Sequence, residues 1–95
     1  MIEILRFRLV PGTDTIAFLD ADKQVQTEFA YQQPGLVRRT TARGADGEWI
    51  VVDLWHSAEA ADDCNAKWGR DDVTKAFMSF LDGESISTSR YLERD

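Results

Sequence analysis

The sequence predicts an α+β fold with elements in the order strand, helix, strand, strand, helix, strand. Residues 48–57 are rich in β-branched and aromatic side chains, as is typical of a strand. Residues 13–33 repeat apolar side chains at the spacing of a helix, and Asp46 with Gly47 forms a hairpin signal between two strands. This order is that of the ferredoxin-like arrangement, in which an antiparallel sheet carries both helices on one face.

Length and composition indicate one folded domain that spans residues 1–95. Of the residues, 43% are hydrophobic and 29% are charged, which is typical of globular domains and not of disordered chains. The net charge of −6 argues against nucleic acids and anionic membranes as partners. The single cysteine, Cys64, excludes an intrachain disulfide and fits a reducing compartment. The sequence starts without a signal-peptide pattern, so we expect a cytoplasmic protein.

The first half of the chain predicts a strand and a long helix. The strand covers residues 2–10 and ends at Pro11 and Gly12. Thr13 or Asp14 caps a helix that continues to about residue 33, where Pro34 and Gly35 end it. The buried stripe of this helix consists of Phe18, Ala21, Val25 and Phe29.

The second half predicts three strands and a broken helix. Residues 36–43 form the second strand and residues 44–47 form the loop to the central strand. Ser57 caps the next helix, which breaks near residues 69–71 and restarts at Asp71 or Asp72. The last strand covers residues 86–93. In the sheet order 4-1-3-2, the first and third strands are neighbours.

Both faces of the central strand are apolar, so we expect both to be covered. We assign Ile50, Val52 and Leu54 to the face under the helices, together with the alternating Leu5, Phe7 and Leu9 of the first strand. The opposite face then holds Trp49, Val51, Asp53, Trp55, Arg6 and Arg8. Two tryptophans on an open sheet predict an interface between two copies of the chain. Arg6 or Arg8 either pairs with Asp53 there or stays solvated at the rim of the sheet.

Four stretches carry a resemblance to a known family. They are residues 25–35, ending in Tyr-Gln-Gln-Pro-Gly; residues 46–61, containing Glu-Trp-Ile-Val-Val-Asp-Leu-Trp-His; residues 77–82, Phe-Met-Ser-Phe-Leu-Asp; and residues 90–93, Arg-Tyr-Leu-Glu. Together they resemble small members of the antibiotic biosynthesis monooxygenase-like group of the dimeric α+β barrel superfamily. The resemblance implies a ferredoxin-like subunit and a homodimer whose sheets form a barrel.

The same resemblance implies a range of activities. Some members oxygenate polycyclic hydroquinones or anthrones without a metal or cofactor, others degrade haem, and many small members have no established activity. In the oxygenating members, the pocket lies between the sheet and the helices. The sequence itself has no phosphate-binding loop, dinucleotide fingerprint or pair of histidines for a metal.

Five residues are candidates for a site. His56 is the only histidine and is the candidate catalytic base, although a hydrogen bond to nearby backbone is the alternative for it. Asn65 and Trp68 lie three residues apart on the second helix and are candidates for substrate binding, as the resemblance implies; otherwise Trp68 is core and Asn65 is a surface amide. Tyr31 and Tyr91 either bind a quinone oxygen or lie at a wet rim.

Two further features have competing interpretations. Cys64 lies on an apolar helix stripe and is expected to be a small buried hydrophobe. Arg38, Arg39 and Arg43 make the second strand basic, which indicates either a protected edge strand or a site for an acidic ligand.

The leading hypothesis is a cofactor-independent monooxygenase-like protein that acts on a phenolic or quinonoid aromatic molecule, with His56 as the base. It requires a shaped apolar pocket with one or two polar groups. One alternative is a non-catalytic dimer that binds a small ligand or stabilises a partner. Another is a haem-binding protein in which His56 is the iron ligand.

Overall fold

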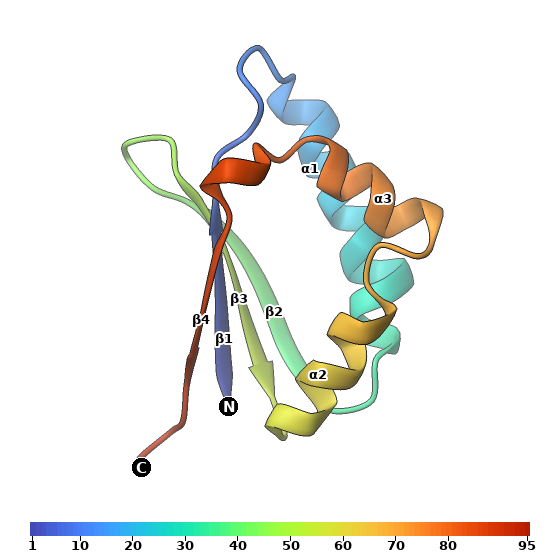
Figure 1. Cartoon of the computed structure of the whole chain (residues 1–95), viewed down its shortest axis with the longest axis vertical. Helices are drawn as coiled ribbons and strands as arrows, with labels where there is room; N and C mark the ends of the chain where they lie inside the picture. The colour runs from blue at the N-terminus through green and yellow to red at the C-terminus, as the bar shows by residue number, and fades with distance from the viewer.

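The computed structural model describes residues 1–95 and contains one four-stranded antiparallel sheet with three α-helices on one of its faces (Figure 1). The strands are β1 (Ile2–Phe7), β2 (Leu36–Arg43), β3 (Trp49–Trp55) and β4 (Ser87–Tyr91), and their order across the sheet is β2-β3-β1-β4. The predicted ferredoxin-like α+β fold and strand order are confirmed. β1 and β4 are shorter than predicted.

Polar side chains begin each α-helix, as the sequence indicates. The helices are α1 (Thr15–Gln24), α2 (Ala58–Lys67) and α3 (Asp72–Ser79). Asp14, Ser57 and Asp71 each accept a hydrogen bond from a backbone N–H in the first turn of their helix. No helix in the structure has the length and apolar character needed to span a lipid bilayer.

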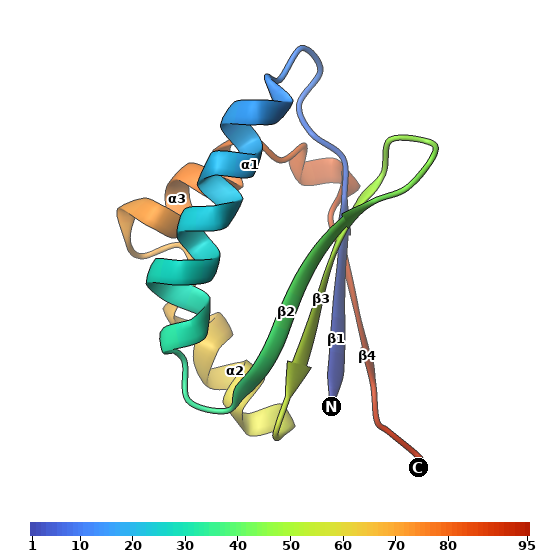
Figure 2. The ribbon, with the colours of Figure 1, turned by 180° about the vertical axis from the view of Figure 1, so that it is seen from behind.

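The long helix predicted for residues 13–33 changes its winding along its length. After α1, the chain continues as a π-helical segment, Val25–Phe29, and a short 3₁₀ segment, Ala30–Gln32. It then turns directly into β2, as Figure 2 shows. Gly35 makes this turn possible because its φ of 88° lies in the left-handed region that favours glycine.

The two faces of β3 are the reverse of the prediction. Leu5 of β1 lies opposite Val51, and Phe7 lies opposite Trp49. Side chains directly opposite each other in an antiparallel pair lie on the same face of the sheet. Trp49, Val51 and Trp55 are accordingly buried on the face that the helices cover. The predicted placement of Leu5 and Phe7 on this face is correct.

The open face of the sheet therefore carries a different set of side chains. Ile50, Val52 and Leu54 lie on it and are half-buried, and Arg6 lies opposite Ile50. Both faces of β3 are apolar, so the sequence alone did not distinguish them, and only the register with β1 does. Four residues expected on the open face with Arg6 and Arg8 lie instead under the helices: Trp49, Val51, Asp53 and Trp55.

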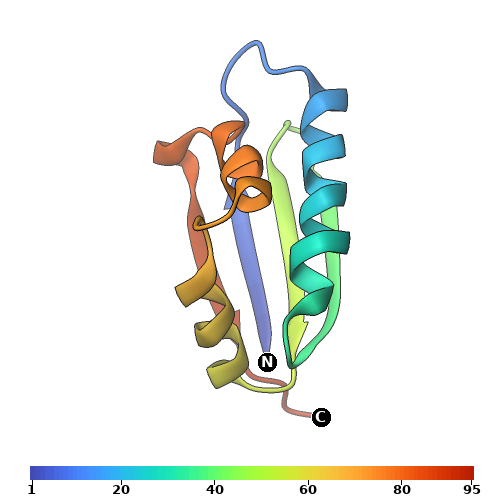
Figure 3. The same ribbon diagram turned by 90° about the vertical axis from the view of Figure 1, so that its right-hand side faces the viewer.

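The core between sheet and helices has two clusters. One contains the fully buried Phe7, Phe18 and Phe77, and the other contains Phe29 and Trp55; Trp68 packs against both clusters. Figure 3 shows α1 along one side of this layer and α2 with α3 along the other, in front of the central strands.

Candidate functional site

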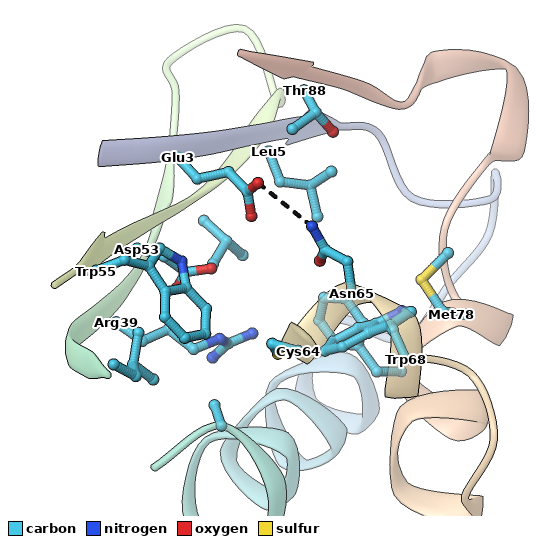
Figure 4. Close-up of a pocket in the computed structure, with 14 residues that line it drawn as sticks. Glu3, Leu5, Arg39, Asp53, Trp55, Cys64, Asn65, Trp68, Met78 and Thr88 are labelled. Atoms are coloured by element: carbon cyan, nitrogen blue, oxygen red, sulfur yellow. Dashed lines mark hydrogen bonds between the residues drawn. The ribbon is translucent and has the colours of Figure 1, made fainter. Parts of the chain in front are cut away.

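A cavity of about 250 Å³ lies between the sheet and the helices. Its walls are mostly apolar, and all four strands contribute to them (Figure 4). This volume is just below the about 300–1,000 Å³ typical of small-molecule pockets. The polar side chains that reach the cavity are Glu3, Arg39, Asp53, Asn65 and Thr88.

β3 forms one wall of the cavity through alternate residues. Val51, Asp53 and Trp55 all face it because side chains of a strand alternate between the two sides of the sheet. Oδ1 of Asp53 and Nε1 of Trp55 are buried and have no hydrogen-bond partner. Buried polar atoms are paired in most proteins, so an unpaired acceptor and an unpaired donor on two residues that line one cavity are candidates for contact with a ligand.

The environment of Asp53 makes its carboxyl group a weaker acid than usual. Burial raises its pKa from 3.8 to about 6, and the negative charges of Glu3 and Asp22 act in the same direction. The positive charge of Arg39 opposes this rise. Glu3 and Arg39 lie directly opposite Asp53 on the two neighbouring strands, β1 and β2.

Arg39 is buried and already paired. Its Nη2 lies 2.7 Å from Oδ1 of Asp22, and its Nη1 donates to the side chain of Gln26 at 3.4 Å. Asp22 also accepts a hydrogen bond from the hydroxyl group of Thr41. The guanidinium group thus acts on Asp53 through its charge and makes no hydrogen bond to it.

Glu3 is also paired. Its Oε2 accepts from Nε of Arg90 at 2.8 Å and from the amide of Asn65 at 3.5 Å. Of the two alternatives for Arg6 and Arg8, pairing with Asp53 does not occur within the chain, since Arg6 donates to Ser89 and the exposed Arg8 pairs with Asp46.

Asn65 and Trp68 form the opposite wall, as Figure 4 shows. The amide of Asn65 points across the cavity to Glu3. The ring of Trp68 packs edge-on against Phe29, with centroids 5.4 Å apart, and against Phe77, with centroids 5.8 Å apart. The structure therefore brings both of these predicted residues to one cavity.

Cys64 is buried and also lines the cavity, in agreement with its prediction as a small buried hydrophobe. Burial, together with the charges of Asp53 and Glu3, raises the pKa of its thiol to about 11. The thiol is therefore protonated at neutral pH and is not a ready nucleophile.

The other predicted site residues lie elsewhere. His56 is exposed at the end of β3 and lines a separate, polar depression with Pro34 and Ser57. Tyr31 is bound through its hydroxyl group to the backbone of Arg39, and Tyr91 lies exposed on β4. The structure does not bring these three residues together with Asn65 and Trp68. No three His, Cys, Asp or Glu side chains converge as metal ligands do.

Solved structures share this architecture over nearly the whole chain. SnoaB, a cofactor-independent oxygenase from Streptomyces nogalater, aligns with a TM-score of 0.79 at 19% identity, covering 99% of this chain and 92% of SnoaB. An antibiotic biosynthesis monooxygenase aligns with a TM-score of 0.69 at 12% identity, covering 98% and 100%. The chain has the fold of the antibiotic biosynthesis monooxygenases. The resemblance predicted from the sequence is confirmed at this level.

Another solved structure also shares this architecture. A conserved protein from Methanosarcina mazei aligns with a TM-score of 0.68 at 16% identity, covering 94% of this chain and 90% of that one. One of the SnoaB structures is a variant in which an asparagine is replaced by alanine. Comparison of the sequence with protein-family models and with curated proteins finds no match.

Proposed function

We propose that the chain is a cofactor-independent monooxygenase that acts on a phenolic or quinonoid aromatic molecule in the cavity between sheet and helices. The observation that carries this proposal is the unpaired polar pair, Asp53 and Trp55, in an otherwise mostly apolar cavity. Apolar walls suit an aromatic ring, and the polar pair suits its oxygen substituents. The fold shared with SnoaB, a cofactor-independent oxygenase, supports the same reaction class.

The reaction needs no external reductant. An anthrone that loses a proton becomes an electron-rich anion that transfers electrons to dioxygen. Its ring CH₂ group becomes a carbonyl group, and the second oxygen atom leaves as water. The protein's part is to bind the ring, promote loss of the proton and exclude bulk water. Asn65 and Trp68 contribute the wall opposite β3.

Ligand binding without turnover is the alternative, because the same cavity would bind an aromatic molecule whether or not oxygen reacts with it. Haem binding through His56 has no support from this cavity, which His56 does not line. We therefore do not propose it.

We also propose that the open face of the sheet packs against a second copy of the chain. Ile4, Val52 and Leu54 give the centre of this face an apolar character, and no helix of the chain covers it. This interface replaces the one predicted around the two tryptophans of β3. Light scattering at micromolar concentration tests it, and a monomeric mass would contradict it.

Oxygen uptake tests the proposed reaction. A panel of anthrones, naphthols and hydroquinones is offered to the wild type and to Asn65→Ala, Trp68→Phe and His56→Ala. We expect uptake above the spontaneous rate that Asn65→Ala and Trp68→Phe reduce. Uptake that only His56→Ala abolishes would assign the base to His56, as the sequence predicted. Binding without uptake would favour ligand binding without turnover. The absence of both binding and uptake would refute the oxygenase and the ligand-binding alternative.

A further inference from the structure

We infer that Asp53 accepts the phenolic proton of the substrate, while the indole N–H of Trp55 holds a neighbouring acceptor oxygen of the same molecule. This inference rests on the proposed function and assigns its base and its orienting donor. It moves the base from the end of β3, where His56 lies, into the cavity.

The placement of the two side chains fits one ligand. Asp53 and Trp55 are two residues apart on one strand, so their backbone positions lie about 6–7 Å apart on the same face. Oδ1 of Asp53 is an acceptor and Nε1 of Trp55 is a donor, and both are buried without partners. An aromatic ring system with two neighbouring oxygen substituents, one of them a hydroxyl group that can lose its proton, offers the matching donor and acceptor.

The other titratable groups around the cavity are less suited to take a proton. The carboxylate of Glu3 is held by Arg90, and that of Asp22 is held by Arg39. The thiol of Cys64 stays protonated at neutral pH because of its raised pKa. Asp53 has no ion pair or hydrogen bond, so its lone pairs are free for a ligand.

The charge balance at Asp53 suits proton transfer at neutral pH. Its pKa of about 6 leaves the carboxylate mostly ionised at pH 7, yet more basic than an ordinary aspartate. The groups that face it are Glu3 on β1, Arg39 on β2, Asp22 on α1 and Cys64 on α2. Arg90 on β4 reaches it only through Glu3, and the α3 residues of the cavity, Phe77 and Met78, carry no charge.

The proton step conserves atoms and electrons. The anthrone reacts as its enol tautomer, in which the ring carbonyl has become a phenolic hydroxyl group and the CH₂ has become a ring CH. This O–H bond breaks, its electron pair stays on the substrate oxygen, and the proton bonds to the carboxylate of Asp53. The resulting phenolate has high electron density at the opposite ring carbon, the former CH₂ carbon, which reacts with dioxygen. Trp55 donates its N–H to a neighbouring hydroxyl oxygen and so fixes which hydroxyl group meets Asp53.

The test of the base is the pH dependence of kcat/KM for oxygen uptake with 1,8-dihydroxyanthrone. The wild type is expected to gain activity through an apparent pKa near 6. Asp53→Asn, which keeps the shape of the side chain, is expected to lose this dependence and about 100-fold or more of the rate. Asp20→Asn, an exposed carboxylate on α1, is the matched control and should keep the wild-type profile. An unchanged profile in Asp53→Asn would overturn the inference and leave the proposed oxygenase standing.

Binding of stable analogues tests the pair independently of turnover. 1,8-Dihydroxyanthraquinone has the hydroxyl groups and anthraquinone lacks them, and tryptophan fluorescence reports the binding of both. Asp53→Asn should weaken only the hydroxylated ligand. Trp55→Phe should weaken both ligands about tenfold, because each has a carbonyl group for the indole N–H. If the wild type shows no turnover, the proposed function fails, and these affinities alone decide the contacts. If the wild type and both variants bound each ligand with equal affinity, the contacts assigned to Asp53 and Trp55 would be overturned.

Discussion

Replacing Asp53 by asparagine should change the stability of the protein in a way that depends on pH. The carboxyl group has a pKa of about 6 in the folded protein against 3.8 for an ordinary aspartate. A raised carboxyl pKa means that the folded state favours the protonated form. Its stabilising contribution is therefore complete below pH 3.8 and is lost as the pH rises through about 6.

The size of the effect follows from the shift. A difference of about two pKa units corresponds to about 3 kcal/mol of unfolding free energy. The Asp53→Asn variant has a neutral side chain at this position, so it does not lose this unfolding free energy as the pH rises. Its stability relative to the wild type should therefore rise by about 2.5 kcal/mol between pH 4 and pH 8, because a small part of the loss has already occurred at pH 4. This is a large part of the about 5–15 kcal/mol that stabilises a typical domain.

Urea unfolding at fixed protein concentration, followed by tryptophan fluorescence, measures the difference at both pH values. Asp20→Asn is the control, since it removes a carboxylate that is exposed on α1. If the difference between Asp53→Asn and the wild type did not change with pH, the carboxylate would have a partner or free access to water. Burial would then not be what raises the pKa of Asp53.

Three further predictions concern packing, the backbone and assembly. Phe77→Ala should cost about 3–5 kcal/mol in urea unfolding because the fully buried ring packs against Phe7 of its own cluster and against Trp68, which lies between the two clusters; a cost below 1 kcal/mol would contradict this packing. Gly35→Ala should destabilise the protein more than Gly12→Ala. Both glycines have positive φ, but only at Gly35 would the new Cβ meet another atom, 2.6 Å from Cβ of Ala60. Equal midpoints in the thermal unfolding of the two variants would argue against this clash. Val52→Lys should convert the proposed dimer to a monomer in light scattering, whereas Val37→Lys, on the exposed part of edge strand β2, should not; a dimer in both variants would place the interface elsewhere.

Local signals in the sequence were enough to predict the elements and their order. Asp14, Ser57 and Asp71 begin their helices because short polar side chains satisfy the free N–H groups of a first turn. The spacing of Asn65 and Trp68 placed them on one surface of the second helical region, and both reach the cavity. These features depend on residues close together in the chain.

The cavity depends on register, which the sequence did not reveal. Asp53 and Trp55 face the helices only because β3 pairs with β1 in one of two alignments, and both faces of β3 are apolar. One signal of the site was present in the sequence. Asp53 is a carboxylate within an apolar strand, and such a residue indicates a site on whichever face of the strand it occupies. Arg39 was indistinguishable from its neighbours on β2, because its burial depends on Asp22, seventeen residues away.

The most direct test of Asp53 as the base is oxygen uptake with 1,8-dihydroxyanthrone between pH 5 and pH 8. Uptake is measured for the wild type, Asp53→Asn and Asp20→Asn, each corrected for the spontaneous rate. We expect uptake by the wild type and by Asp20→Asn to rise through pH 6, and Asp53→Asn to retain about 1% of the wild-type uptake or less. Equal uptake by Asp53→Asn and the wild type would contradict the role of this carboxylate, and no uptake by the wild type would contradict the oxygenase.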